Sequence, residues 1–341
     1  TTAAAPFFNP NTSVDSQLYN NGVPLGPLPG SGQAGGNIDL FAKDFKLPQV
    51  LKASLAFDRK LPGGLVLTAE AIYNDNLNAI QYQNLNVAGP QTYTTGADVR
   101  PRYNGVLVDS KYQGIYLASN KKAGSAWNTN LTLTKYFQSD FIDANISATY
   151  SYGESNVWMD ATSSQNSSQW QYMETVNGSN VIPGVTRSDF EQGSRVMANS
   201  SIKFKWNNYM KTTVGLYYEG AQGTPFSYVY NDNGRILGDT FQNSALVYVP
   251  ANRSEINLVT VTGNALTPDQ QWEALNSFIS GNKYLESRRG KYTERNGDRL
   301  AWSHVIDLKL AQEFKINVNN KSHKLEFTAD VFNFTNMLNK N

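Results

Sequence analysis

Four pairs of segments in this chain alternate polar and apolar residues almost without error, and only a few residues join the two members of each pair. In the pair 302–314 and 323–331, apolar side chains occupy one parity and charged side chains the other. Successive side chains of a strand point to opposite faces, so each segment is predicted to be a two-faced strand. A strand of about ten residues can cross a bilayer core at a tilt. The pattern therefore predicts an all-β fold, a transmembrane antiparallel up-and-down β-barrel.

The other three pairs are 50–59 with 65–74, 127–137 with 141–152, and 196–206 with 209–218. Their expected turns are short, and Asn207-Asn208 is expected to form a two-residue turn because Asn tolerates positive φ. Long connections cover about 76–111, 154–193 and 221–301. Short turns at one end and long loops at the other are typical of bacterial outer-membrane barrels.

The number of strands between two long loops must be even if both loops lie on the same side. Three strands are visible between the first two loops, at 112–120, 127–137 and 141–152. A further strand is therefore expected. The leading candidate is 103–108, with a turn at 109–111, and the alternative is 79–87.

Composition excludes several classes of protein. The chain has 341 residues, no Cys, two His and a formal net charge of +1. No apolar run reaches the 18 or more residues of a membrane-spanning helix. Near-zero charge argues against a nucleic-acid partner, and the missing thiols argue against disulfides and thiolate metal sites. We expect no enzymatic activity, no cofactor and no metal.

Aromatic residues cluster at the ends of the predicted strands, as in the interfacial girdles of membrane barrels. The examples are Trp127, Phe137, Phe141, Trp206, Tyr209, Trp302 and Phe314. The alternative is a soluble β-sandwich in which these side chains cap a core between two sheets. That arrangement would leave the opposite, strongly polar face of many long strands fully solvated.

Residues 1–47 are rich in Pro, Gly and Asn and are expected to form a loop between barrel strands. Within them, 30–35 fits the G-x-G-x-x-G pattern, but the Pro-rich context favours a loop over a dinucleotide site. Residues 48–341 are expected to form part of a larger barrel. The first residues carry no targeting signal and the last do not complete a strand, so we expect further chain at both ends.

A helix is predicted at about 268–281, inside the longest loop. Thr267 is a capping residue and Pro268 suits the first helical position. Trp272, Leu275, Phe278 and Ile279 follow at helical spacing. The face formed by Trp272, Leu275 and Phe278 is expected to pack on neighbouring loops, and docking of a partner is the alternative.

Charged residues are densest where this loop returns to the barrel wall. They are either a rim that contacts substrate or partner, or a mutually paired network that anchors the loop. The cluster comprises Glu286, Arg288, Arg289, Lys291, Glu294, Arg295, Asp298 and Arg299. A second charged set alternates with apolar residues in the strands, and a Lys at the lipid midplane would cost about 2–4 kcal/mol. These side chains are therefore expected to face the lumen: Lys203, Lys205, Lys309, Glu313, Glu326 and Asp330.

Three further features have weak chemical interpretations. His304 is expected on the outer apolar face beside Trp302, and His323 at a turn. Neither lies at a spacing that suggests a catalytic triad. The segment 231–234 is predicted to be a plain turn, since it lacks the closing acid of an EF-hand calcium loop.

Several motifs resemble one family. The runs 284–302 and 307–314 resemble the late barrel of TonB-dependent transporters of the Oar-like branch from Bacteroidetes, relatives of the SusC-type transporters. The segment 327–339 is similar to that family's penultimate region. Further similar segments lie at 60–64, 217–228 and 246–250, so the resemblance extends over about 48–341.

This resemblance implies a barrel of 22 strands in the outer membrane of a Gram-negative bacterium, filled by an N-terminal plug domain. It implies ligand capture by extracellular loops and import with energy from TonB. The expected partners are the TonB complex, reached through a region missing from this sequence, the protein's own plug, the lipid bilayer and, as a candidate, a surface lipoprotein. A passive porin-like channel and a surface-binding or adhesion protein anchored by its barrel are the alternatives.

Overall fold

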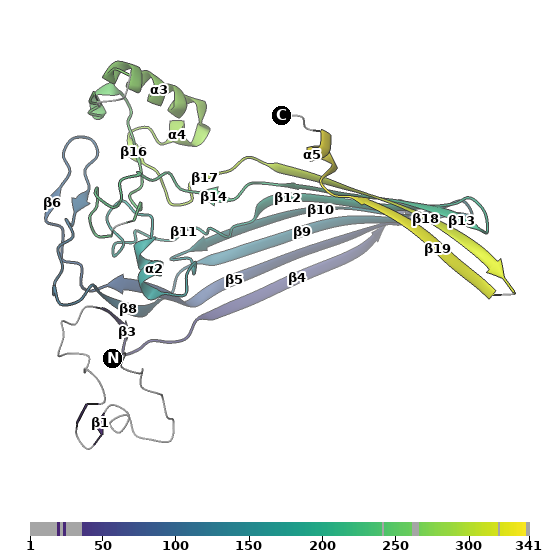
Figure 1. Cartoon of the computed structure of the whole chain (residues 1–341), viewed down its shortest axis with the longest axis horizontal. Helices are drawn as coiled ribbons and strands as arrows, with labels where there is room; N and C mark the ends of the chain where they lie inside the picture. Colours follow the sequence, from purple (N-terminus) through teal and green to yellow (C-terminus); the bar gives the residue numbers. More distant parts are fainter. Residues whose placement is uncertain are drawn as a thin grey trace, which may run out of the picture.

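A single large β-sheet dominates the computed structural model, which describes residues 19–20, 23–24, 36–240, 242–260, 266–319 and 321–338. The sheet has 11 strands, in the order β19-β18-β13-β12-β10-β9-β5-β8-β3, with β4 paired to β5 and β11 to β10. Its pairs are antiparallel except for β3 with β8. In Figure 1 the long strands lie side by side and curve toward β18 and β19, while α2, α3, α4 and the long loops gather at the opposite end.

The strands of the sheet are β3 (Asn37–Phe41), β4 (Gln49–Leu61), β5 (Leu65–Asn84), β8 (Gly114–Lys121), β9 (Ser125–Gln138), β10 (Ile142–Val157), β11 (Thr186–Arg187), β12 (Gly193–Lys205), β13 (Met210–Ala221), β18 (Ser303–Val318) and β19 (Lys321–Val331). The other strands form two-residue pairs: β1 (Tyr19–Asn20), β2 (Val23–Pro24), β6 (Thr92–Tyr93), β7 (Pro101–Arg102), β14 (Pro225–Phe226), β15 (Tyr248–Val249), β16 (Lys291–Tyr292) and β17 (Asp298–Arg299). The helices are η1 (Pro62–Gly64), α2 (Asn166–Gln171), η2 (Arg253–Glu255), α3 (Pro268–Gly281), α4 (Lys283–Ser287) and α5 (Phe334–Leu338). In the described part of the chain, none of these helices has both the length and the apolar character needed to cross a membrane.

All four predicted hairpins are confirmed, as β4/β5, β9/β10, β12/β13 and β18/β19. The prediction for Asn207-Asn208 was wrong in its mechanism, because neither residue has a positive φ. Instead, the Asn207 side chain accepts hydrogen bonds from the backbone N–H groups of Tyr209 and Met210, each at 2.8 Å. Asn side chains form such local turns readily. Of the predicted loop 1–47, residues 1–35 and their glycine pattern lie outside the described residues, apart from β1 and β2. The prediction was wrong for residues 37–41, which form β3 by pairing with β8.

The additional strand expected from parity is absent from the described residues. The predicted strands 112–120 and 127–137 correspond to β8 and β9, which lie end to end along β5 and count as one crossing, so the number of strands between the two loops is already even. The 20-residue strand β5 pairs with β9 along its lower half and with β8 along its upper half, in the same register. Between β8 and β9 the ladder continues through a 3.0 Å hydrogen bond from the Asn76 N–H to the Gly124 carbonyl. The segment 103–108 contributes only an isolated bridge at Leu107, and 79–84 is the top of β5.

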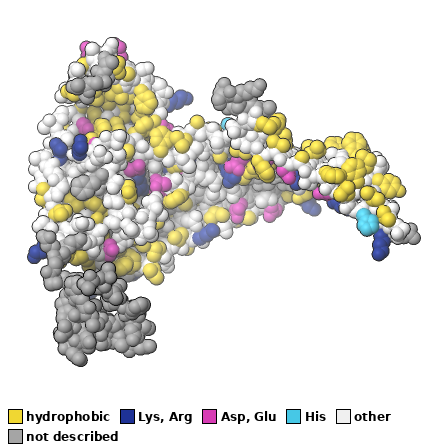
Figure 2. All heavy atoms as spheres, in the orientation of Figure 1, with side chains coloured by type: hydrophobic (Ala, Val, Ile, Leu, Met, Phe, Trp, Pro, Cys, Tyr) yellow, Lys and Arg dark blue, Asp and Glu magenta, His cyan; other side chains and the backbone are white. Residues whose placement is uncertain are grey.

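The two faces of the sheet differ in polarity, because residues opposite one another in register share a face. The six strand residues predicted to face the lumen all lie on one face, where Lys309 pairs with Asp330 at 3.2 Å and Lys205 with Asp143 at 2.9 Å. The other face carries apolar side chains that nothing covers, such as Leu55 (76% exposed), Phe327 (61%) and Leu310 (50%). Figure 2 shows hydrophobic side chains gathered over the end of the sheet formed by β18 and β19.

Rings border this apolar face at two levels. Near the hairpin turns, Phe141 and Phe204 lie 5.4 and 5.7 Å from Trp206, measured between ring centroids. Near the loops, Tyr73 packs on Trp127 at 4.5 Å. Counted through the register of β9, β10 and β12, about 12 residues, or about 40 Å of strand, separate the level of Trp127 from that of Phe204. At a tilt of about 40° this gives an apolar band about 30 Å tall, close to the thickness of a bilayer's hydrocarbon core.

The β-sandwich alternative fails for the described residues. Every sheet other than the large one has two strands, so no second sheet covers the apolar face. The buried apolar cluster lies instead among the loops, where Val249, Ile279 and Leu285 are 1–3% exposed. Helix α3 covers the predicted range, and Thr267 and Gln270 form a capping box at its start. Its packing face differs from the prediction, since Leu275 and Ile279 pack inward while Phe278 is 59% exposed.

Gly124 joins β8 to β9 with a φ of +100°, and a Cβ there would lie 2.8 Å from the carbonyl oxygen of Asn156. We predict that Gly124→Ala destabilises the sheet by about 1–3 kcal/mol, because both the backbone strain and the clash must be relieved. The measurement is the urea midpoint followed by tryptophan fluorescence. Gly89→Ala is the matched control, since its Cβ would meet nothing within 4 Å. Equal midpoints for the two variants would contradict this account of the β8–β9 junction.

Candidate functional site

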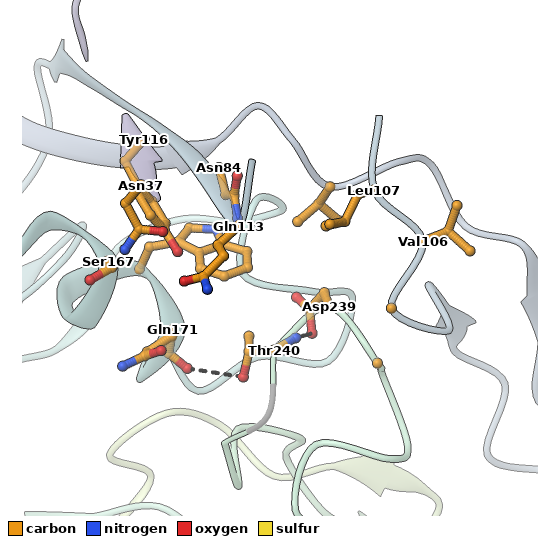
Figure 3. Close-up of a pocket in the computed structure, with 14 residues that line it drawn as sticks. Asn37, Asn84, Val106, Leu107, Gln113, Tyr116, Ser167, Gln171, Asp239 and Thr240 are labelled. Atoms are coloured by element: carbon orange, nitrogen blue, oxygen red, sulfur yellow. Dashed lines mark hydrogen bonds between the residues drawn. The ribbon is translucent and has the colours of Figure 1, made fainter. Parts of the chain in front are cut away.

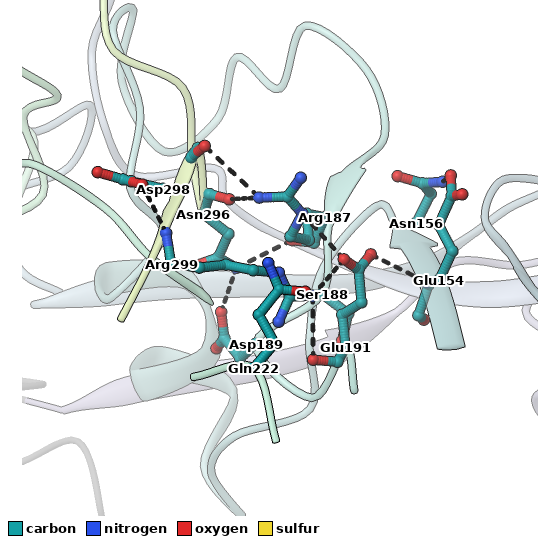
Figure 4. A network of polar contacts seen from close by, with 12 residues as sticks. Glu154, Asn156, Arg187, Ser188, Asp189, Glu191, Gln222, Asn296, Asp298 and Arg299 are labelled. Atoms are coloured by element: carbon teal, nitrogen blue, oxygen red, sulfur yellow. Dashed lines mark hydrogen bonds and ion pairs between the residues drawn. The ribbon is translucent and has the colours of Figure 1, made fainter. Parts of the chain in front are cut away.

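The long loops converge above one end of the sheet, and a buried carboxylate joins three of their segments. Glu191 forms ion pairs with Arg299 and with Arg187, whose Nε lies 3.0 Å from its carboxylate, and it accepts a hydrogen bond from the Ser155 N–H at 3.0 Å. Its side chain is 6% exposed. Figure 4 shows Glu191 between these partners, beside the end of β10. A buried carboxylate is tolerated when it is paired with cations and hydrogen-bonded, and here two guanidinium groups contact Oε1 while the backbone N–H of Ser155 donates to Oε2.

Asn296 ties the returning end of the longest loop to the same region. Its φ is +56°, a conformation that Asn adopts more readily than most residues. Its side chain donates to the Arg187 carbonyl at 2.9 Å and to Asp189 at 2.5 Å, and its carbonyl accepts from the Arg187 Nη1 at 2.9 Å. The turn at Asn296 therefore fixes where Arg295 and Arg299 lie.

Arg295 lies at the centre of a buried acidic group. It is 8% exposed and donates to the Thr186 hydroxyl at 2.7 Å and the Met173 sulfur at 2.8 Å. Burial lowers the pKa of its guanidinium, and the carboxylates of Asp160, Asp189 and Glu174 oppose that effect. Burial likewise raises the pKa of the Glu174 carboxyl, which a hydrogen bond from Ser227 partly offsets. The charges hold the loops together at a desolvation cost to each group.

The remaining charged residues predicted at the rim, apart from the exposed Lys291, make side-chain contacts within the loop. Arg288 contacts Glu294 at 2.9 Å, and Arg289 contacts Glu286 at 2.8 Å. Asp298 accepts from the Asn282 amide at 2.9 Å and from the Tyr228 hydroxyl at 3.2 Å. The geometry agrees with the expectation of a paired network anchoring the loop. Contact with a ligand or partner, through this cluster or through the half-buried Trp272 and exposed Phe278, stays a prediction.

Sequence reasoning missed Arg100, which fastens the first long loop to the third. Its side chain is fully buried, pairs with Asp98 at 2.8 Å and lies over the rings of Tyr230 (5.3 Å) and Tyr292 (4.9 Å). Burial raises the pKa of Tyr292 to about 12, so its hydroxyl stays protonated and donates to the Val99 carbonyl at 2.8 Å. No signal in the sequence distinguishes Arg100 from other loop arginines.

A cavity of about 460 Å³ opens between the three long loops (Figure 3). Its lining comes from β3 and β8, from the first long loop, from α2 and from the turn after Gly238. Gly238 has a φ of +72°, and a Cβ there would lie 2.8 Å from the Asn104 N–H. That close approach lets the Gly105 N–H reach the Gly238 carbonyl at 2.7 Å and close one side of the cavity. The lining is mostly amide and aliphatic, a composition that no sequence pattern indicated.

The weaker chemical candidates have structural roles. Asp232 accepts from the Gly234 N–H at 3.1 Å and the Ile236 N–H at 2.6 Å, which agrees with the predicted turn. His304 lies on the apolar face between the rings of Trp302 and Tyr218. Among the described residues, no group of three or more His, Cys, Asp or Glu has the geometry to hold a metal.

No protein-family model matches the chain, and no curated protein matches it. Among solved structures, it is similar to the outer membrane transporter YddB from Escherichia coli, with 13% identity over 87% of this chain and 34% of that chain and a TM-score of 0.39. It is also similar to the FrpB iron transporter from Neisseria meningitidis (F5-1 variant), with 10% identity over 84% of this chain and 34% of that chain and a TM-score of 0.27. The chain spans about a third of the length of both transporters.

Because Arg100 is fully buried whereas Asp98 is 28% exposed, the two partners should respond differently to substitution. We predict that Asp98→Asn lowers the stability of the loop assembly by about 3–5 kcal/mol, since it leaves a buried cation without an anion. Adding Arg100→Met should restore part of this loss. The thermal midpoint and the rate of trypsin cleavage in the loops measure both effects. A double variant no more stable than Asp98→Asn would contradict the role given to the pair.

The raised pKa of Glu174 sets the sign of a pH effect. The folded state holds this proton more tightly than the unfolded state, so loop stability should rise as pH falls from 7 toward the ordinary carboxyl range near 4. Glu174→Gln should reduce the difference between the thermal midpoints at pH 5 and pH 7. The exposed Glu273→Gln is the control, and an equal reduction there would refute the assignment.

Proposed function

We propose that this chain forms wall strands and extracellular loops of an outer-membrane transporter that captures a ligand with its loops and imports it with energy from TonB. One observation carries the proposal: a curved antiparallel sheet with a charged face and an uncovered apolar face bordered by rings at two levels. Exposed apolar surface on this scale marks a surface that contacts a partner or a membrane. Its band of about 30 Å matches the hydrocarbon core of a bilayer.

Lipid also explains the polarity of the opposite face. Its ion pairs are partly exposed, as in Lys324 with Glu313 at 2.8 Å and Glu326 at 2.7 Å. In a water-filled lumen such residues keep their hydration, whereas toward lipid each charge would be costly. The proposal therefore assigns Lys203, Lys205, Lys309, Glu313, Glu326 and Asp330 to the lumen wall.

The strand edges support a larger closed barrel. Within the described residues, β4 pairs only with β5 and β19 only with β18, so both outer edges keep free backbone groups. A membrane-spanning sheet must close, because unpaired backbone groups cannot be hydrated in lipid. We propose closure by further strands of the same protein, in a barrel of 22 strands around an N-terminal plug. The strand count, the plug, the TonB energy source and the SusC-related branch rest on the motif resemblance.

The loops suit ligand capture because they are fixed in place. Glu191 and Arg100 fasten them to the sheet and to one another, and a cavity lies between them. A candidate lipoprotein partner would meet the protein on this side. The decisive experiment compares uptake in cells with and without TonB, using the full-length protein. Uptake that is independent of TonB would favour the passive channel, and binding without uptake would favour the surface-binding protein.

Leu216 and Ser201 test which face contacts lipid. They lie at nearly the same height on β13 and β12, but on the apolar and the polar face. We predict that Leu216→Arg weakens insertion into bilayers by about 2–4 kcal/mol, whereas Ser201→Arg has little effect. Insertion is measured by the shift of the folded band on unheated electrophoresis gels after refolding into vesicles. The opposite order of effects would place lipid against the charged face and overturn the proposal.

A further inference from the structure

The cavity between the long loops presents carboxamides whose side chains have no hydrogen-bond partner among the described residues. Asn37, Gln113 and Gln171 line it, and none of their side-chain amides hydrogen-bonds to another described residue. In Figure 3 these three side chains lie on one side of the cavity, and Val106 and Leu107 on the other. A carboxamide carries donors and an acceptor in one plane, so it complements a group that has both.

The charges around the cavity exclude most ionic ligands. None of its described lining residues is Lys, Arg or His, so nothing there neutralises a phosphate or carboxylate. The lining carboxylate, Asp239, accepts from the Ser179 N–H at 2.6 Å and the Thr240 N–H at 3.0 Å. Burial raises the pKa of this carboxyl, and the backbone donors engage both of its oxygens, so its attraction for a cation is weakened. The cavity therefore suits an uncharged ligand.

Which apolar side chains are accessible in the cavity indicates whether a peptide or a saccharide fits it better. Proteins often bind sugars by stacking an aromatic face on the ring, but Tyr116 and Trp170 are 6% and 3% exposed and pack against each other at 5.9 Å. The accessible apolar surface is aliphatic, since Val106 is 40% and Leu107 37% exposed. Such surface fits an aliphatic side chain, and burying it favours binding.

We propose that this cavity binds a short uncharged peptide segment, with main-chain amides against Asn37, Gln113 and Gln171 and an aliphatic side chain against Val106 and Leu107. A peptide group presents one donor and one acceptor, the pair that each carboxamide can satisfy. The assignment rests on the proposed function, which gives this end of the sheet access to ligands outside the cell.

The test uses the full chain folded in detergent micelles and an equimolar library of N-acetylated, C-amidated tripeptides. Bound peptides are separated by size exclusion and identified by mass spectrometry. Neutral peptides that contain Val, Leu or Ile should be enriched about tenfold over acidic or basic ones. Gln113→Ala/Gln171→Ala should reduce this enrichment about tenfold, since each amide contributes hydrogen bonds of modest strength.

Gln165→Ala is the matched control, because Gln165 precedes α2, is exposed and lies outside the cavity lining. Gln113→Lys should instead shift enrichment toward acidic peptides. Three results would overturn the proposal: no enrichment of neutral peptides, enrichment that the double variant leaves unchanged, or saturable binding of maltotriose that the double variant abolishes. Selection of neutral peptides by a chain that fails to insert into bilayers would support the peptide site and contradict the proposed transporter.

Discussion

The separation of polar from apolar side chains across a continuous hydrogen-bonded ladder is the constraint on which the rest of this structure depends. Each strand alternates with a period of two, and the register of most residue pairs matches apolar with apolar and polar with polar, although Glu219 lies opposite Val305. A slip of one residue in any pair would mix the two faces. The short turns prevent such a slip, for example where the Asn207 side chain fixes the start of β13.

The loops obey a different constraint. They hold most of the buried apolar side chains, such as Trp170, Leu237 and Val249, and they also bury charged side chains that several segments share. Glu191 joins β10, the segment after β11 and the strand pair β14/β17, while Arg100 joins the first loop to the third. A shared charge fixes geometry well, because its directional donors must all be in place at once. It also makes the loops interdependent, so the cavity between them belongs to no single loop.

The sequence predicted the elements that repeat and missed those that depend on distant contacts. Alternation identified the four hairpins, and the capping pattern of Thr267 and Pro268 located α3. The strand count was wrong because the break between β8 and β9 looks, in the sequence, like the end of one strand and the start of another. Phe278 has the right spacing for a packed helix face. However, α3 packs over Val249 in an orientation that buries Leu275 and Ile279 instead. Arg100 and the amides of the cavity carry no local signal, since their partners lie far away in the chain.

The unbroken register through β5, β8 and β9 also bears on how such a protein can change during evolution. Asn84 and Tyr116 line the cavity as paired strand residues at the upper end of β5 and β8. The register of the strands below them therefore determines which way their side chains point. Adding or deleting two residues in β5 would raise or lower the binding surface without rotating it. Adding or deleting one would turn its side chains to the opposite side. Lineages descended from such an ancestor should therefore vary freely in loop length while their long strands change length in steps of two.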